Sequence, residues 1–459
     1  MNEELSAIKE KSTLPSSVGK AVKVAITDLD GVLRGKYIAL EKFQSALESG
    51  FGFCNVVFGW DLHDACLADT QYTGWHTGYP DALVKLDMTT RRSIPWEPGC
   101  DLVLGDFWED NLKTPLAVCP RQLLKRVVKY AEHLGFDTKC GLEFEWYNFA
   151  ESPQSVQERH FTDLQLLTPG MFGYSVIRSG LNRDYFQALF HELLQFRVPL
   201  EGLHCESGPG VIEGALAASS ALEAADRGIL LKTAVKEIAY RFGYLPSFMA
   251  KWNAKLPGSS GHLHQSLLRR KSGENAFYDS HSSDHLSADF RHYIAGQVQL
   301  LPSFLTFLAP NVNSYKRFVP GVWAPTRMNW GYDNRTAALR VLSCGPKATR
   351  LETRIGGADI NPYLAIAAAL WAGLYGIEHK LELTQPPQLG NQTDNPAALG
   401  KEFPTHLHAA AQMLKNEPIA REFLGDTLLN HWLVTREWEW KRFESAVTDY
   451  ELARYLEIV

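Results

Sequence analysis

The first hundred residues alternate between short apolar runs and polar breaks, a pattern typical of strands. In VKVAITDLDGVLRGKYI, apolar and β-branched residues flank the pair Asp30-Gly31, which predicts two strands joined by a tight turn. From there to about Val118, further strand-like runs are broken by proline and glycine, and helical periodicity is weak. We therefore expect a small α+β domain at residues 21–117, preceded by a flexible N-terminus at residues 1–20.

Helical periodicity begins with CPRQLLKRVVKYAEHLGF, where Pro120 predicts the start of a helix and Gly135 its end. Three later segments have the same period and are too long to be strands: RDYFQALFHELLQF, GALAASSALEAADRGILLKTAVKEIAYRF and NPYLAIAAALWAGLYGIEHKL. Strands alternate with these helices, so we predict a large α+β domain at residues 118–459 with helices packed outside a sheet. The polar segment TQPPQLGNQTDNPAALG predicts a surface loop.

Composition and charge narrow the class of protein. A chain of 459 residues fits one small and one large domain, and its net charge of -6 is spread without long blocks of like charge. This pattern argues against nucleic-acid and membrane-surface partners. The seven cysteines form no C-x-x-C pair and predict reduced thiols. We see neither a signal-peptide pattern nor an apolar run of membrane-spanning length, and we expect a cytoplasmic protein.

One predicted strand, GLEFEWYNF, carries two carboxylates. Glu143 and Glu145 are two residues apart, so on a strand both point to the same side. A solvated strand face is the simplest interpretation of such a pair. However, the aromatic residues that flank the pair indicate burial, where unpaired carboxylates are costly, and this favours a bound metal ion.

Two further strands repeat this geometry. In PGSSGHLHQSL, His262 and His264 point the same way after a Gly/Ser turn, so one imidazole can bind metal and the other phosphate. In KATRLETRIGG, Arg350, Glu352 and Arg354 share one strand face. Taken alone, this last run is best interpreted as an exposed ion-pair ladder, but beside a metal its guanidinium groups suit a polyphosphate.

Additional acidic and basic residues complete the pattern. Glu206 and Glu213 stand on either side of a Ser-Gly-Pro-Gly turn, and the oxygen-rich set suits Mg²⁺ or Mn²⁺ better than zinc. Arg317, Arg335 and Arg340 are the type of side chain that holds carboxylates and phosphates. Together these residues imply divalent metals, a nucleotide phosphate and a carboxylate substrate.

In this combination of motifs, the chain resembles the class I glutamine synthetases from the early hairpin to VTDYELARYL near its end. The resemblance implies a small N-terminal β-grasp domain and a large catalytic domain with a funnel-shaped sheet. It also implies ATP as a substrate, L-glutamate as the acid, and two or three Mg²⁺ or Mn²⁺ ions in each site. Members of this family usually form dodecamers of two hexameric rings, with active sites between neighbouring subunits.

The resemblance assigns roles to individual residues. The metal nearer glutamate would be held by Glu145, Glu206 and Glu213, and the nucleotide-side metal by Glu143, His262 and Glu352. His264 and Ser266 match positions beside ATP, and Arg340 and Arg350 match phosphate-binding arginines. Arg335 matches the arginine that stabilises the transferring phosphoryl group. Arg317 and Arg354 match those that hold the carboxylates of glutamate, and the backbone of Gly258 matches the position that receives its amino group.

Departures from the family pattern concern the acceptor side. Where true glutamine synthetases carry a lid glutamate that helps to deprotonate ammonium, RFVPGVWAP has Trp323, which offers an apolar surface to an amine. Pro257 replaces the asparagine of the glycine-rich turn before His262, and Gly261 its methionine. The segment FGWDLHDACL aligns loosely with the ammonium-binding loop and makes Asp61 a catalytic candidate, with Trp60 and His63 beside it. The tyrosine motif for adenylylation is not recognisable.

These changes resemble the γ-glutamyl-amine ligases, which act in amine catabolism on polyamines, isopropylamine or aniline. We expect an ATP-dependent ligase that joins L-glutamate to a small hydrophobic primary amine through γ-glutamyl phosphate. An aromatic amine is attractive because it is largely neutral at pH 7 and can attack without a lid carboxylate as base. An ordinary glutamine synthetase that uses ammonia is the alternative. A non-catalytic relative with a structural or sensing role is a further one.

Overall fold

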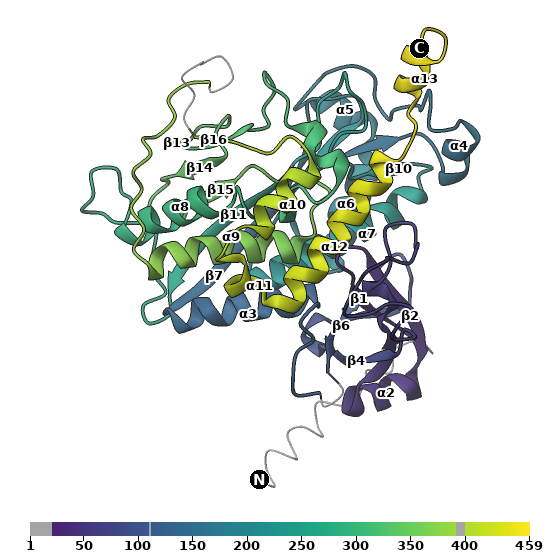
Figure 1. The fold of residues 1–459 in the computed structure, drawn as a ribbon, viewed down its shortest axis with the longest axis horizontal. Coiled ribbons are helices and arrows are strands. Elements are labelled where there is room, and N and C mark those ends of the chain that lie inside the picture. Colours follow the sequence, from purple (N-terminus) through teal and green to yellow (C-terminus); the bar gives the residue numbers. More distant parts are fainter. Residues whose placement is uncertain (1–20, 110–111, 392–399) are drawn as a thin grey trace.

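A computed structural model describes residues 21–109, 112–391 and 400–459. The N-terminal segment predicted to be flexible, residues 1–20, lies outside this range, as does part of the predicted surface loop. The described chain forms a small N-terminal sheet domain and a large domain that combines a second sheet with long helices (Figure 1). The predicted α+β fold class is confirmed.

The N-terminal domain is built on a six-stranded sheet of order β2-β1-β6-β4-β3, with β5 beside β6. Its strands are β1 (Ala21–Thr27), β2 (Leu33–Ala39), β3 (Phe51–Cys54), β4 (Asp81–Leu86), β5 (Arg92–Ser93) and β6 (Asp101–Trp108). The antiparallel pairing of β1 with β2 confirms the predicted hairpin. The helix α2 (Leu40–Ser49) was not predicted, and it buries Phe43 and Ala46.

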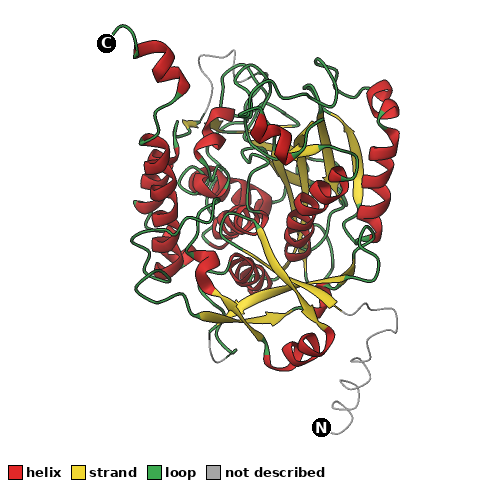
Figure 2. Cartoon of the chain, turned by 90° about the vertical axis from the view of Figure 1, so that its right-hand side faces the viewer, coloured by secondary structure: helices red, strands yellow, loops and turns green. Residues whose placement is uncertain are grey.

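The large domain contains an eight-stranded sheet of order β13-β14-β15-β11-β7-β9-β8, with β10 beside β7. Its strands are β7 (Phe136–Phe149), β8 (Leu200–Cys205), β9 (Val211–Leu216), β10 (Leu245–Ser247), β11 (Gly261–Arg269), β13 (Trp330–Tyr332), β14 (Leu339–Leu342) and β15 (Arg350–Thr353). A separate two-stranded sheet pairs β12 (Arg327–Met328) with β16 (Lys401–Glu402). In Figure 2 the long helices flank the strands of the large sheet, and the N-terminal sheet lies at the bottom.

Three predicted helices are confirmed and one began later than expected. The longer helices are α3 (Pro120–His133), α6 (Arg183–Gln195), α7 (Ala221–Tyr240), α8 (Ala288–Leu300), α9 (Pro362–Glu378), α10 (Leu407–Lys415) and α12 (Asp426–Glu444). The shorter ones are α4 (Pro153–Glu158), α5 (Val176–Leu181), α11 (Ala420–Leu424) and α13 (Asp449–Tyr455), and the 3₁₀ turns include η4 (Val312–Arg317). The prediction that helix extends back to Gly214 was wrong, because residues 211–216 pair with both β7 and β8 and form a central strand.

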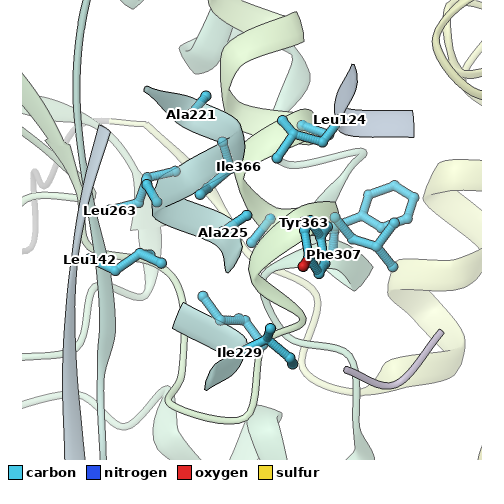
Figure 3. Packing of buried hydrophobic residues seen from close by; sticks show 14 of the residues in the cluster. Leu124, Leu142, Ala221, Ala225, Ile229, Leu263, Phe307, Tyr363 and Ile366 are labelled. Atoms are coloured by element: carbon cyan, nitrogen blue, oxygen red, sulfur yellow. The ribbon is translucent and has the colours of Figure 1, made fainter. Parts of the chain in front are cut away.

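The core explains why one face of the large sheet is left for polar groups. Leu142 on β7 and Leu263 on β11 are fully buried and lie against α7 (Figure 3). At Gly228 on α7, an added Cβ would come within 2.7 Å of Leu142, so helix and strand are in close contact. Burying each such leucine contributes about 1.5–3 kcal/mol. Because side chains alternate along a strand, this packing turns Glu143 and Glu145 to the opposite face.

The two domains meet through the turn of the first hairpin. The side-chain amide of Asn361, the residue before α9, donates to the carbonyl groups of Asp28 and Leu29 at 3.2 and 3.0 Å. Arg436 on α12 donates to Asp30 at 2.6 Å. Gly31 has a φ of 79°, and a Cβ there would lie 3.0 Å from Asn361, so this turn needs glycine. The hairpin is therefore fixed against the large domain.

Two expectations from composition can be compared with the structure. All seven cysteines are free thiols, and Cys100, Cys119, Cys140 and Cys205 are buried. Among the described residues, none of the helices combines the length and apolar character needed to cross a membrane.

Candidate active site

The polar face of the large sheet collects its charged residues by strand register. In the pairing of β7 with β11, Glu143 lies opposite His262, and in the pairing of β7 with β9, Glu145 lies opposite Glu213. Glu352 on β15 lies opposite both His264 and Arg340 on its two neighbouring strands. Residues distant in sequence thus form one row across the sheet, as the two-residue spacings predicted.

The first cluster joins Glu143, His262 and Glu352. The Nδ1 atom of His262 lies 3.7 Å from Glu143 and 3.5 Å from Glu352. Burial and the Arg354 guanidinium lower the pKa of His262, which favours the neutral imidazole that binds metals. Burial opposes ionisation of Glu352, but His262 and Arg354 lower its pKa to about 2. Two ionised carboxylates and a neutral imidazole therefore lie close enough together to bind the same ion.

The second cluster joins Glu145, Glu206 and Glu213. Burial and the neighbouring Glu213 carboxylate raise the pKa of Glu145 to about 7. Three partly buried carboxylates this close together therefore repel one another unless a cation lies between them. One Glu145 oxygen accepts a hydrogen bond from the Ser260 amide at 2.7 Å, which fixes the carboxylate beside the glycine-rich turn.

Both clusters fit divalent metal ions. Ligand atoms come within 4.8 Å of one another in three sets: Glu143, His264 and Glu352; Glu143, Glu213 and His262; and His204, Glu206 and Glu213. Carboxylate oxygens predominate, with an imidazole in each set and no cysteine, which is a donor chemistry that suits Mg²⁺ or Mn²⁺. All six predicted metal ligands lie in or beside these sets.

Two residues near the second cluster were missed by the sequence analysis. His204 on β8 lies 3.2 Å from Glu206 and 3.4 Å from Glu213, and although burial works against its charged form, these carboxylates raise its pKa to about 9. Tyr174 stacks on the His204 ring at 4.6 Å, and its amide donates to Cys205. The spacing of His204 from Glu206 is the two-residue signal already used for Glu143 and Glu145. Tyr174 sits in a loop and gave no such signal.

A pair of buried arginines lies beside the glycine-rich turn. Arg317 donates to the Ile355 carbonyl and the Ser260 hydroxyl, each at 2.9 Å, and burial lowers its pKa only to about 10, so it stays charged at neutral pH. Arg354 donates to Glu352 and, at 3.0 Å, to the Arg335 carbonyl. At Gly258 an added Cβ would lie 2.9 Å from the Arg317 side chain. The predicted glutamate-binding residues Arg317, Arg354 and Gly258 are therefore neighbours.

A hollow of about 300 Å³ lies beside this row of residues. Its lining includes the predicted nucleotide-binding residues His264, Ser266 and Arg350, together with Glu143 and Lys347, which was not predicted. Arg350 donates to Nδ1 of His264 at 3.2 Å, so the protonated Nε2 of His264 faces Glu143 at 3.1 Å. This arrangement places cationic donors around a space open to a ligand.

Trp323 and Arg335 line a separate hollow of about 420 Å³ with Tyr332, Asp333 and Leu389. Trp323 is 68% exposed and Leu389 is 79% exposed. An apolar surface therefore lies next to the guanidinium predicted to meet the phosphoryl group.

Asp61 is not brought to these clusters within the described chain. It accepts hydrogen bonds from Trp438 on α12 at 3.1 Å and from the amides of His63 and Ala65. These bonds lower its pKa despite burial. Asp61 and His63 line a hollow of about 480 Å³ with η4 and α12, while Trp60 packs against Arg34. The predicted catalytic role of Asp61 stays a prediction.

Comparisons with known proteins identify the family of this chain. Residues 117–455 match the family model described as "Glutamine synthetase, catalytic domain". A type-1 glutamine synthetase 2 of Dictyostelium discoideum is 48% identical over 439 residues, covering 95% of this chain and 84% of the relative. A glutamate–isopropylamine ligase of a Pseudomonas species is 35% identical, covering 95% of each chain. The solved structure "Apo GmaS without ligand" has the same fold, with a TM-score of 0.83, 24% identity and full coverage of both chains.

Proposed function

We propose that this chain, which belongs to the glutamine synthetase family of ATP-dependent carbon–nitrogen ligases, joins L-glutamate to a small hydrophobic primary amine. Family membership is firm, since the family model and relatives above 30% identity span most of the chain. The observation that carries the choice of amine is Trp323, whose exposed ring lines the same hollow as Arg335. The reaction would supply γ-glutamyl amides to amine catabolism.

Different residues of the site bind glutamate, bind ATP and stabilise the transferring phosphoryl group. Arg317 and Arg354 bind the carboxylates of glutamate, and the backbone of Gly258 receives its amino group. Arg340, Arg350, His264 and Ser266 bind ATP. Divalent ions held by the two clusters would neutralise phosphate charge during transfer. Arg335 stabilises the γ-phosphoryl group as it moves to the side-chain carboxylate of glutamate.

In the second step the amine attacks the acyl phosphate, phosphate leaves, and the nitrogen loses one proton. Ammonium and isopropylammonium must each lose a proton before they can attack, whereas an aromatic amine is neutral at pH 7. Asp333 is the acidic residue among the described residues that line the Trp323 hollow, and it is paired with Arg340. This hollow therefore offers an apolar amine a surface and offers ammonium little counter-charge.

An ordinary glutamine synthetase is the second candidate. The 48% identical relative carries that name, and it is closer in sequence than the isopropylamine ligase. Under this alternative, Trp323 would be tolerated at the lid without changing the acceptor.

We also propose that the chain works in the cytoplasm as a dodecamer of two hexameric rings, in which Asp61 serves the site of a neighbouring subunit. The family resemblance is the main support. Exposed apolar side chains add to it, since Met171, Val176, Ile177 and Leu181 gather in one segment and α13 has no buried residues (Figure 1).

Phosphate release tests the choice of amine. Purified protein with ATP, Mg²⁺ and L-glutamate is given ammonium, putrescine, isopropylamine or aniline as the variable acceptor. The proposal expects the highest kcat/KM with isopropylamine or aniline. A higher kcat/KM with ammonium would establish the glutamine synthetase alternative instead.

A further inference from the structure

Arg340 is held between two carboxylates of different character. Its Nη1 donates to Glu352, which is 1% exposed in its side chain, at 2.8 Å. Its Nε and Nη2 both donate to Oδ1 of Asp333, at 2.8 and 2.5 Å. The Asp333 side chain is 70% exposed. The guanidinium thus joins the buried metal cluster to an exposed carboxylate at its rim.

The backbone of Asp333 is fixed in the place where this contact forms. Its amide donates to the Val341 carbonyl at 2.9 Å, next to Arg340 on β14. Asp333 has a φ of 44°, a left-handed conformation that aspartate tolerates better than most residues. The following Asn334 anchors the turn through its side chain, which donates to the carbonyl groups of Gln388 and Gly390 at 3.1 and 2.9 Å. These backbone and Asn334 contacts therefore hold the Asp333 carboxylate next to Arg340, although the Asp333 side chain is exposed.

Asp333 and Glu352 contact the Arg340 guanidinium from two sides. Glu352 also accepts a hydrogen bond from Arg354 and lies 3.5 Å from His262. Two adjacent N–H groups on one oxygen of Asp333 fix rotation of the guanidinium, while its Nη1 edge stays directed at the cluster. Without Asp333, Glu352 would be the one carboxylate that Arg340 contacts within the described chain, and the guanidinium would lose this orientation.

We propose that Asp333 is a positioning residue that orients Arg340 for the nucleotide phosphate. This inference rests on the proposed role of Arg340 in binding ATP. Asp333 acts through Arg340.

The test compares Asp333→Ala, Asp333→Glu and Arg340→Ala with the unaltered protein. Binding of a non-hydrolysable ATP analogue in the presence of Mg²⁺ is measured by calorimetry, and KM is measured separately for ATP, glutamate and amine. Asp333→Ala is expected to weaken analogue binding and raise KM for ATP about tenfold, the scale of one charge-assisted hydrogen-bonded pair. KM for glutamate and the midpoint of thermal unfolding should stay unchanged. Asp333→Glu should restore most of the analogue affinity.

The outcomes distinguish the positioning role of Asp333 from the ATP-binding role of Arg340. If Arg340→Ala weakens analogue binding and Asp333→Ala does not, the positioning role is refuted and the role of Arg340 stands. If Arg340→Ala also leaves analogue binding unchanged, both assignments fail. A rise in KM for the amine with an unchanged KM for ATP would place Asp333 on the acceptor side and overturn the inference.

Discussion

Removing the Trp323 ring tests the acceptor assignment by mutation. We expect Trp323→Ala to raise KM for isopropylamine or aniline while leaving KM for glutamate unchanged. The physical reason is that the exposed ring supplies apolar area and a stacking face to an apolar amine and supplies neither benefit to ammonium.

The size of the effect follows from the exposure of the ring. Trp323 is 68% exposed, which leaves on the order of 150 Å² of a tryptophan surface open to a ligand. If the amine covers about half of that area, burial at about 25 cal/mol per Å² gives about 2 kcal/mol. A difference of this size corresponds to a roughly 30-fold change in KM when KM follows binding.

The assay is amine saturation kinetics at fixed ATP and glutamate for the unaltered protein, Trp323→Ala, Trp323→Phe and Trp323→Glu. Trp323→Phe keeps an aromatic face and should lose less than Trp323→Ala. Trp323→Glu introduces a carboxylate into this hollow and should improve kcat/KM for ammonium while lowering kcat/KM for the apolar amine. If Trp323→Ala changes KM by the same factor for ammonium and for the apolar amines, the reasoning from the ring is refuted.

Three further predictions concern other parts of the molecule. Gly258→Ala should raise KM for glutamate about tenfold, because its Cβ would lie 2.6 Å from the Ala250 carbonyl and 2.9 Å from Arg317; unchanged glutamate kinetics would contradict this contact. Arg335→Ala should keep the thermal unfolding midpoint and lower kcat about 100-fold or more, whereas normal turnover would overturn its assigned role. Burial lowers the pKa of His431 from 6.5 to about 4, and the hydrogen bond that its Nε2 donates to the Phe58 carbonyl offsets this only in part. Its buried Nδ1 has no hydrogen-bond partner among the described residues. The unfolded state therefore binds more protons between these pH values, and stability should fall by about 3 kcal/mol as pH drops through this window. In denaturant unfolding, His431→Gln should lose less stability over this pH range than the unaltered protein. An equal loss would show that His431 is not the group responsible.

The site was predictable from sequence wherever strand alternation exposed it. Glu143 and Glu145, and His262 and His264, could be placed on one face because neighbouring apolar residues had to face the helices. His204 and Glu206 have the same two-residue spacing, which likewise indicates that their side chains point to one side of the strand. These residues needed only local geometry.

Other features depended on tertiary contacts that sequence does not display. Residues 211–216 resemble the start of the long alanine-rich helix, and only their pairing with β7 and β8 makes them a strand. The contact of Asp333 with Arg340 depends on a turn whose left-handed residue no apolar pattern predicts.

A competition experiment tests the central claim most directly. Purified protein is incubated with ATP, Mg²⁺, L-glutamate and equal concentrations of ammonium, isopropylamine and aniline, and the amide products are quantified by mass spectrometry. We predict that γ-glutamyl isopropylamide or γ-glutamyl anilide will exceed glutamine. Glutamine as the dominant product would contradict the account and show that Trp323 does not select an apolar amine.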